Sequence, residues 1–263
     1  MLRRARVLRA IYERMPADIQ AVARFTNAPC RKLRRAGTWY AEALVTSNRS
    51  ATSPSAFLKR VGALAKVRPY TLLTPARLNA LYDMATAVER EHIPGDVVEC
   101  GVWNGGGSGM VARSLQASDS EKHQWLFDSF QGLPEPEEVD GPMAVGMAGE
   151  LRAHPERVAS IVSSSGRPMD RVHIVQGWFE ETLPKADVRQ VALLHIDADW
   201  YSSVKLCLNL LYDRVSPGGF IVFDDYGYWE GCRAAVQEFW SERGITNELI
   251  QIDSDSYYIR KDG

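Results

Sequence analysis

Two stretches of the sequence decide the fold: Leu194–Tyr201 (LHIDADWY) and Ile221–Tyr226 (IVFDDY). Each begins as an apolar run and ends in carboxylates. The apolar runs, over Val191–Ile196 and Phe220–Phe223, are rich in branched or aromatic residues. Such runs are typical of strands that are buried on both faces of a parallel sheet. The two stretches therefore predict two inner strands of an α/β sheet.

The acidic ends of these strands predict a metal site. Asp197 and Asp224 are 27 residues apart, which leaves room for one crossover helix and a turn. A right-handed crossover brings both strand ends to the edge at which open α/β sheets bind ligands. There the carboxylates of Asp197, Asp199, Asp224 and Asp225 would repel one another unless a cation neutralised them. Oxygen ligands favour Mg²⁺, with Mn²⁺ or Ca²⁺ as substitutes. The alternative is that these residues only cap the helices that follow.

The composition is that of an ordinary globular chain: 263 residues, 45% hydrophobic and 24% charged, with a formal net charge of −2. This near-neutral balance gives no reason to expect nucleic acid as a partner. The four cysteines (Cys30, Cys100, Cys207 and Cys232) show no metal-binding spacing, and we expect free thiols in a reducing compartment. Neither an apolar run long enough for a transmembrane segment nor a signal peptide is recognisable. We therefore expect a cytoplasmic protein.

Residues 1–67 are expected to form a helical extension before a catalytic domain at residues 68–263. Met1–Arg35 carries ten Arg and Lys residues, with apolar residues at roughly helical spacing, as in a basic amphipathic helix. Such a helix could make a peripheral contact with an anionic membrane, or pack on the main domain or on a second subunit. Thr46–Ser55 is polar, and we expect a flexible connector that could become a lid over bound substrate.

A glycine-rich turn follows the first expected strand. Val97–Cys100 runs into glycines at positions 101, 105, 106 and 107, and a helix is expected to begin near Ser108. Glycines let the backbone approach a ligand closely, and the helix N-terminus favours a carboxylate or phosphate. The spacing is not the G-x-G-x-x-G of dinucleotide-binding proteins. It resembles motif I of class I S-adenosylmethionine-dependent methyltransferases. Asp128, at the end of the next strand, is placed to accept hydrogen bonds from a ribose, or else to cap the turn after it.

The rest of the chain predicts the remaining elements of an α/β sheet. Gln176, Gly177 and Trp178 follow the third expected strand, where the loop of a methyltransferase sheet flanks the adenine. The aromatic segment Tyr226–Glu230 suits the flat face of a sugar or an aromatic ring. The expected helices are Ala76–Val88, Gly149–Ser163, Ser202 to about Arg214, and Cys232–Ser241; a turn is expected over Ser216–Gly219, the third strand over Arg171–Val175, and a C-terminal hairpin from Glu248–Ile252 and Tyr257–Arg260.

Together these motifs resemble the macrocin O-methyltransferase family, the sugar O-methyltransferases of macrolide and aminocoumarin antibiotic pathways. The resemblance covers about Arg68 to Arg260. It implies a three-layer α/β/α Rossmann-like fold with a seven-stranded, mostly parallel sheet and a C-terminal hairpin. The segments that carry it are ECGVWNGG (99–106), FDSFQGLP (127–134), GWFEETLP (177–184), HIDADWYSS (195–203), and PGG with DDY (217–219 and 224–226).

The resemblance also implies roles for individual residues. Mg²⁺ would be held by Asp197, Asp224 and Asp225, and Asp199 matches the position proposed as the general base. Asp197 and His195 are further candidates for catalysis, and His195 would act through water or serve only as a core histidine. The candidates for binding S-adenosylmethionine are Thr71, Glu99, Gly101, Asn104, Gly105, Gly106, Ser108, Asp128, Ser129, Gln176, Gly177, Trp178 and Asp197.

The sequence therefore predicts a Mg²⁺-dependent O-methyltransferase that moves a methyl group from S-adenosylmethionine to a sugar hydroxyl of a glycosylated small molecule or a saccharide. We expect a homodimer or larger assembly, as is common in the family. Two alternatives stay open. One is an NAD(P)-dependent oxidoreductase, which shares the α/β pattern but does not need the Asp-Asp pair. The other is a non-catalytic module whose basic N-terminus binds anionic lipid or a lipid-linked glycan.

Overall fold

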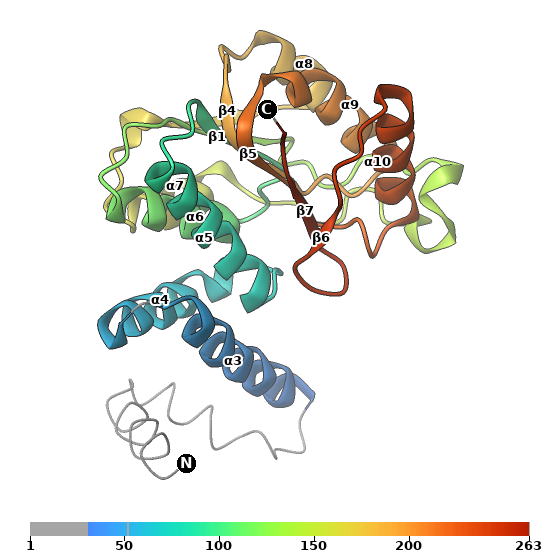
Figure 1. The fold of residues 1–263 in the computed structure, drawn as a ribbon. Helices are drawn as coiled ribbons and strands as arrows, with labels where there is room; N and C mark the ends of the chain where they lie inside the picture. Colours follow the sequence, from blue (N-terminus) through green and yellow to red (C-terminus); the bar gives the residue numbers. More distant parts are fainter. Residues whose placement is uncertain (1–30, 52, 263) are drawn as a thin grey trace. The chain divides into compact units, whose positions relative to one another are not determined.

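The computed structural model describes residues 31–51 and 53–262 (Figure 1). The described residues divide into two compact units: one comprises those up to Leu64 with Thr74–Ala76, and the other comprises Ala65–Leu73 with those from Arg77 onward. Most of the basic segment predicted over residues 1–35 lies outside the described residues. Within residues 31–51 and 53–262, every helix is too short or too polar to cross a bilayer.

The first unit contains helix α3 (Arg31–Ser50) and most of helix α4 (Pro54–Val67). The predicted connector over Thr46–Ser55 is wrong for its first half, because α3 continues through it to Ser50. The hydroxyl of Thr46 donates a hydrogen bond to the carbonyl of Glu42, 2.8 Å away and one turn back. A polar stretch can stay helical in this way, since Ser and Thr hydroxyls bond to the preceding turn.

The second unit is built on a seven-stranded sheet with the strand order β3-β2-β1-β4-β5-β7-β6. The first five strands are parallel, and β7 runs antiparallel to both β5 and β6. This confirms the predicted mostly parallel sheet with a C-terminal hairpin. The strands are β1 (Asp96–Cys100), β2 (Gln124–Asp128), β3 (Val172–Gln176), β4 (Val191–Ile196), β5 (Val215–Phe223), β6 (Ile250–Gln251) and β7 (Tyr257–Arg260).

Helices cover both faces of the sheet and complete the three predicted layers (Figure 1). One face carries α5 (Pro75–Arg90), α6 (Gly106–Ala117) and α7 (Pro155–Ser163); the other carries α8 (Phe179–Thr182), α9 (Tyr201–Leu211) and α10 (Glu230–Arg243). Short 3₁₀ turns join several elements: Arg68–Tyr70, Glu138–Asp140, Pro142–Ala144, Met169–Arg171, Leu183–Lys185 and Tyr212–Arg214.

Strand register decides which side chains reach which face. Glu99 of β1 pairs with His195 of β4, so these two polar residues point to the same side of the sheet. Their apolar neighbours Cys100 and Ile196 point to the opposite side, into the core beneath α9 and α10. Two buried polar residues on adjacent inner strands are unusual in a parallel sheet, which directs attention to their end of the sheet.

Two predicted elements differ from the structure. The helix predicted over Gly149–Ser163 begins only at Pro155, because Gly149 and Leu151 have φ angles of +76° and +60°, which a right-handed helix does not allow. The turn predicted over Ser216–Gly219 lies inside β5 as an irregularity, since Val191 pairs with Val215 and Leu193 pairs with Phe220.

Candidate active site

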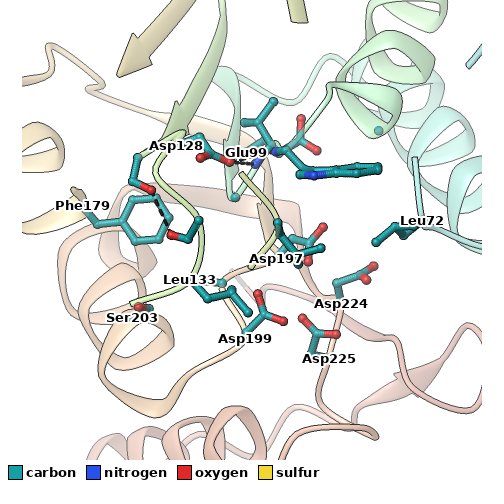
Figure 2. Close-up of a pocket in the computed structure, with 18 of the residues that line it drawn as sticks. Leu72, Glu99, Asp128, Leu133, Phe179, Asp197, Asp199, Ser203, Asp224 and Asp225 are labelled. Atoms are coloured by element: carbon teal, nitrogen blue, oxygen red, sulfur yellow. Dashed lines mark hydrogen bonds between the residues drawn. The ribbon is translucent and has the colours of Figure 1, made fainter. Parts of the chain in front are cut away.

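The carboxyl ends of the central parallel strands open onto a cavity of about 610 Å³ (Figure 2). The carboxylates of Asp197, Asp199, Asp224 and Asp225 gather on one side of it, and Asp128 lies apart from them. The cavity is thus bounded both by the glycine-rich turn after β1 and by the acidic ends of β4 and β5. Further wall residues are Tyr70, Leu72, Leu73, Arg77, Val102, Trp103, Gly107, Gly132, Leu133, Pro134, Leu151, Phe179, Glu180, Ala198, Ser202, Ser203 and Leu206.

In the glycine-rich turn, backbone segments lie so close together that a side chain would not fit between them. Gly101 has a φ angle of +89°, and a Cβ atom there would lie 1.7 Å from the carbonyl oxygen of Asp197. A Cβ at Gly106 would lie 2.3 Å from Cβ of Thr71, and one at Gly107 would lie 2.7 Å from Oε1 of Glu99. The glycines therefore let the ends of β1 and β4 meet and let α6 begin close to the cavity.

Asp128 organises the wall on the side of β2. One of its carboxylate oxygens accepts hydrogen bonds from the backbone N–H groups of Val102 and Trp103, both at 2.8 Å. The other accepts one from the N–H of Phe130 at 2.6 Å. A carboxylate offers about four acceptor positions, so Asp128 can hold the glycine-rich turn and still face a polar ligand in the cavity.

Three carboxylates converge closely enough to share one ion. Asp197, Asp199 and Asp225 each offer an oxygen, and these oxygens lie within 4.8 Å of one another. Burial, and next the charge of Asp224, raises the pKa of Asp197 well above its usual range. Burial and the charge of Asp199 do the same to the pKa of Asp225. Like charges held together out of water favour protonation, or a cation in its place.

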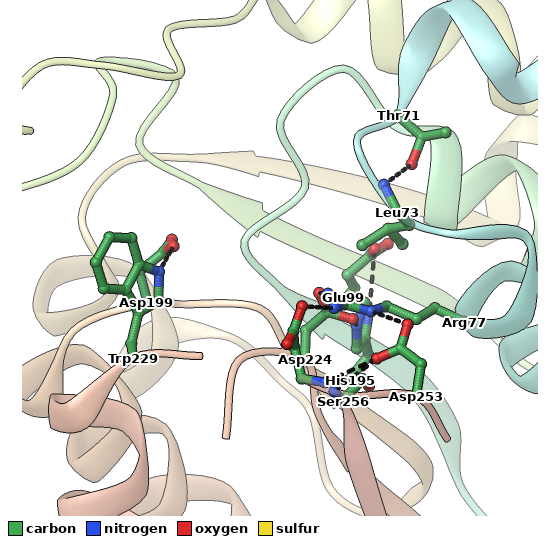
Figure 3. Close-up of polar contacts among 11 residues, drawn as sticks. Thr71, Leu73, Arg77, Glu99, His195, Asp199, Asp224, Trp229, Asp253 and Ser256 are labelled. Carbon is green, nitrogen blue, oxygen red and sulfur yellow. Dashed lines mark hydrogen bonds and ion pairs between the residues drawn. The ribbon is translucent and has the colours of Figure 1, made fainter. Parts of the chain in front are cut away.

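Asp224 adjoins this group but faces two cationic partners (Figure 3). Its Oδ2 accepts a hydrogen bond from Nη1 of Arg77 at 2.5 Å. Its Oδ1 lies 3.5 Å from Nε2 of His195 and has no hydrogen-bond partner among the described residues. Oδ2 of Asp225 is also buried without a partner among them. Buried carboxylate oxygens are normally satisfied, so Oδ2 of Asp225 fits a ligand that the protein itself does not supply, whereas Oδ1 of Asp224 has the ion pair with His195 and room for a closer partner.

The donor set is chemically suited to a hard divalent cation. Its ligand atoms are all oxygens, which Mg²⁺ prefers, from Asp197, Asp199, Asp224 and Asp225. The nearby thiol of Cys232 is buried, and burial raises its pKa, which favours the protonated thiol over a thiolate ligand. The structure brings Asp199 into the group as closely as the predicted ligands Asp197 and Asp225. The distances alone therefore do not decide whether Asp199 or Asp224 is the third metal ligand. The hydrogen bonds that each carboxylate makes are the better guide.

Asp199 is held in an unusual conformation at the start of the crossover. Its φ angle is +54°, a region that L-residues seldom occupy and that Asp tolerates better than most. Its Oδ1 accepts a hydrogen bond from Nε1 of Trp229 at 2.8 Å. Burial raises the pKa of Asp199 to about 6, although the bond from Trp229 lowers it. Trp229 belongs to the aromatic segment predicted to face a sugar, and it lies buried behind Asp199 instead.

His195 lies beneath the cavity wall rather than in it. Its side chain is only 3% exposed, and its Nδ1 lies 3.2 Å from Oε1 of Glu99, whose other oxygen accepts a hydrogen bond from the hydroxyl of Ser108. Burial lowers the pKa of His195, but the carboxylates of Asp224 and Glu99 outweigh it and raise the pKa to about 10. Both ring nitrogens thus face acidic neighbours, and His195 contacts Asp224 from the buried side of the cavity wall.

The structure separates the residues predicted for the site into two groups. Thr71, Glu99, Gly101, Gly106, Asp128, Ser129, Trp178, Asp197, Asp199, Asp224 and Asp225 line the cavity, whereas His195, Asn104, Gly105, Ser108, Gln176 and Gly177 do not. Gly105 is the N-cap of α6, with φ +87°, and the N–H of Gly177 donates a hydrogen bond to the carbonyl of Asp128 at 3.0 Å. Both act on the backbone that frames the cavity.

Arg77 is a charged wall residue that the sequence did not predict. It is 8% exposed and lies four positions before the buried Leu81 on α5. Positions four apart lie on the same side of a helix, so an arginine in the apolar stripe of α5 was the available signal. Trp103 was missed as well, although it sits within the glycine-rich motif; its φ angle is +47°, and nothing in a local pattern predicts that angle for tryptophan.

Comparison with known proteins identifies relatives of this chain. The family model "Macrocin-O-methyltransferase (TylF)" matches residues 8–261, so the match begins well before Arg68. Mycinamicin III 3''-O-methyltransferase of Micromonospora griseorubida is 36% identical over 200 residues, which are 73% of this chain and 78% of the relative. Demethyldecarbamoylnovobiocin O-methyltransferase of Streptomyces niveus is 34% identical over 201 residues, 72% of this chain and 74% of the relative.

Solved structures agree with the sequence relatives. The O-methyltransferase NovP superposes with a TM-score of 0.70 at 33% identity, over 74% of this chain and 83% of NovP. An O-methyltransferase from Bacillus cereus shares the fold, with a TM-score of 0.53 at 14% identity over 85% of this chain and 99% of that one. From the match to the family model and the identity to its relatives, the chain belongs to the macrocin O-methyltransferase family and is an O-methyltransferase.

Proposed function

We propose that this chain transfers a methyl group from S-adenosylmethionine to a sugar hydroxyl of a glycosylated small molecule or a saccharide, with the help of Mg²⁺. The observation that carries the proposal is that the glycine-rich turn and the four clustered carboxylates line the same cavity. A donor on the turn and an acceptor on the acidic side would then face each other. A further relative supports the acceptor class: 8-demethyl-8-(2,3-dimethoxy-alpha-L-rhamnosyl)-tetracenomycin-C 4'-O-methyltransferase of Streptomyces olivaceus, 34% identical over 197 residues, has a rhamnosyl group in the name of its acceptor.

The hydrogen bonds of the site suggest how the carboxylates divide the work. Asp224 has one buried oxygen without a hydrogen-bond partner among the described residues, and so does Asp225. We assign these two residues and Asp197 to Mg²⁺. Asp199, whose Oδ1 is held by Trp229, keeps its other oxygen for the proton of the acceptor hydroxyl. Its pKa of about 6, set by burial, suits a general base near neutral pH.

The methyl donor and the metal ion would each contribute one chemical function. Bound S-adenosylmethionine would supply an electrophilic methyl group, and a bound divalent cation would lower the pKa of the acceptor hydroxyl. The protein's own share is to place both reactants in line and to exclude water. The apolar wall residues Leu72, Leu133, Phe179 and Leu206 suit that second task.

The activity test is methyl transfer to a panel of glycosylated acceptors, read as a mass gain of one methyl group. We expect transfer in the presence of Mg²⁺ and none in chelator-treated protein. Asp199→Asn should lower the rate by roughly a hundredfold or more, as expected for loss of a general base, while Mn²⁺ binding persists. Asp224→Asn should lose Mn²⁺ binding. Transfer that survives chelation would refute the metal's role, and loss of Mn²⁺ binding in Asp199→Asn alone would exchange the two assignments.

The rival functions have less support. The glycine spacing differs from the dinucleotide fingerprint, and the relatives named above are methyltransferases rather than oxidoreductases. A lipid-binding role depends on the basic N-terminal segment, which lies mainly outside the described residues. Our proposal includes a homodimer or larger assembly, testable by light scattering, and a cytoplasmic location. The latter agrees with the free, buried thiols of Cys100, Cys207 and Cys232.

A further inference from the structure

We propose that Arg77 is a positioning residue for the metal site: it clamps Asp224 to the turn of the C-terminal hairpin and thereby sets the affinity for the divalent cation. This inference rests on the proposed function, because it presupposes that Asp224 is a metal ligand. It extends the site to α5 and to residues 253–256, which supply no ligand themselves.

Arg77 contacts carboxylates from two distant parts of the chain, and Figure 3 shows two of them, Asp224 and Asp253. Nη1 donates to Oδ2 of Asp224 at 2.5 Å, Nε donates to Oδ2 of Asp253 at 2.8 Å, and Nη2 donates to Oδ2 of Asp255 at 2.8 Å. The side chain of Arg77 is only 10% exposed. A planar guanidinium with fixed donor directions can orient several carboxylates at once, which the single ammonium of a lysine cannot do.

The hairpin turn is held by its own hydrogen bonds, so it offers Arg77 an ordered anchor. Oδ1 of Asp253 accepts hydrogen bonds from the backbone N–H groups of Asp255 and Ser256, both at 3.0 Å. The turn also touches the segment after Asp225 directly: the N–H of Gly227 donates to the carbonyl of Asp255 at 2.7 Å. A Cβ at Gly227 would lie 2.2 Å from the carbonyl oxygen of Ser254. The Asp224-Asp225 pair is thus connected to this turn twice, through Arg77 at Asp224 and directly at Gly227.

This arrangement has two consequences for a cation. Arg77 occupies Oδ2 of Asp224, so the carboxylate can present only Oδ1 to a cation; this oxygen lies 3.5 Å from Nε2 of His195 and makes no hydrogen bond to the described residues. The positive charge of Arg77 also offsets the repulsion between Asp224 and its acidic neighbours before a cation arrives. Groups that orient metal ligands in this way typically change metal affinity by about 10–100-fold when they are replaced.

A simpler explanation is that Arg77 only fastens the hairpin to α5. The hairpin offers a matched control for that explanation, because Arg260 of β7 also ties it to the rest of the sheet. Arg260 donates hydrogen bonds to the carbonyl of Gly218 at 2.9 Å and to the carboxylate of Glu91. It pairs with Phe220, which lies within β5 four residues before Asp224. Its loss should loosen the hairpin without touching the metal ligands.

The test is a titration of the full chain with Mn²⁺, following free Mn²⁺ by electron paramagnetic resonance. We compare the wild type with Arg77→Lys, Arg77→Met and Arg260→Lys. We expect both Arg77 variants to raise the Kd for Mn²⁺ at least about tenfold, and Arg260→Lys to stay within about twofold. Affinity for S-adenosylhomocysteine without metal should be unchanged in all of them. Excess Mg²⁺ should restore methyl transfer to Arg77→Lys, which a purely structural defect would not allow.

The outcomes separate the inference from the proposed function. A wild type that does not bind Mn²⁺ would refute the metal-dependent function itself. A wild type that binds Mn²⁺, with Arg77→Lys binding equally tightly, would overturn only the role of Arg77; so would an equal loss in Arg260→Lys. If the Arg77 variants do not fold, Asp255→Asn removes one partner of Arg77 at a partly exposed position. It should still weaken Mn²⁺ binding, by less than the loss expected for the Arg77 variants, and unchanged affinity would contradict the inference.

Discussion

Gly101 shows how much of the site depends on a missing side chain. Its φ angle of +89° is one that glycine adopts freely and other residues do not. The carbonyl oxygen of Asp197 occupies the position where a side chain would begin. Asp199 and Trp103, which also border the cavity, have positive φ angles without being glycine. Unfavourable backbone angles of this kind persist where the surrounding structure enforces them, and they cluster at functional sites.

Replacing Gly101 by alanine should therefore destabilise the protein and disturb the cavity. The new methyl group would collide with the backbone of Asp197, so we expect a loss of at least about 2 kcal/mol in the free energy of unfolding, measured by urea denaturation. Gly146→Ala is the matched control, because Gly146 has a similar φ angle of +82° but no neighbouring atom within 4 Å. The control should lose only about 1 kcal/mol, the cost of the left-handed angle. Equal losses in the two variants would disprove the collision.

Helix α9 illustrates how an element is completed by a distant part of the chain. The side chain of its N-cap residue, Trp200, accepts no hydrogen bond from the first N–H groups of the helix. The N–H of Tyr201 instead donates to Oδ1 of Asp140 at 2.7 Å, and Oδ2 of Asp140 accepts the N–H of Glu137 at 2.7 Å. The indole of Trp200 donates to the carbonyl of Pro134 at 2.9 Å. The loop between β2 and α7 thus fastens the segment that carries Asp197 and Asp199.

Asp140→Ala should reveal this capping role. The substitution leaves the first N–H of α9 buried without an acceptor, and we expect a loss of about 1–2 kcal/mol in the free energy of unfolding, as for other lost helix caps. Asp140→Asn retains an oxygen for Tyr201 and should lose less. Asp187→Ala, at a highly exposed carboxylate that contacts only Arg189 among the interactions described for it, should change stability by less than about 0.5 kcal/mol. If Asp140→Ala changed the free energy of unfolding no more than Asp187→Ala does, α9 would not need the cap.

At the scale of the whole molecule, one sheet edge carries the chemistry because the connections between parallel strands return every strand end to the same side. The 610 Å³ cavity lies where open α/β sheets generally bind ligands. A ligand that binds there only in the folded state should stabilise the fold by mass action, by about 2.7 kcal/mol at a concentration of 100 times its Kd.

S-adenosylhomocysteine should therefore raise the melting temperature by several degrees, since about 1 kcal/mol corresponds to roughly 2–4 °C for a domain of this size. NAD⁺ and NADH at the same concentration should leave it unchanged, because the glycine turn lacks the dinucleotide spacing. The measurement is a thermal-shift series without added metal. A shift produced by NAD⁺ and absent with S-adenosylhomocysteine would favour the oxidoreductase instead.

Much of this architecture was predictable because local sequence patterns determine it. Apolar runs such as Val191–Ile196 favour burial. A glycine-rich turn before a helix favours an anionic ligand, although it can also be a plain connection between a strand and a helix. Handedness and connection rules then bring the acidic strand ends of Asp197 and Asp224 together. The predicted helix over Gly149–Ser163 failed at its start because Leu151 adopts a backbone angle that depends on tertiary contacts rather than on periodicity.

The chain's own sequence thus determined the sheet, the family and the set of acidic and glycine residues that border the cavity. Only the tertiary structure decided how each carboxylate is engaged: Asp224 by Arg77, Asp199 by Trp229, and the start of α9 by Asp140. Arg77 and Asp253 are 176 positions apart, and no spacing rule connects them. Such bonds depend on the exact approach of packed elements, whereas strands and turns follow from the preferences of neighbouring residues.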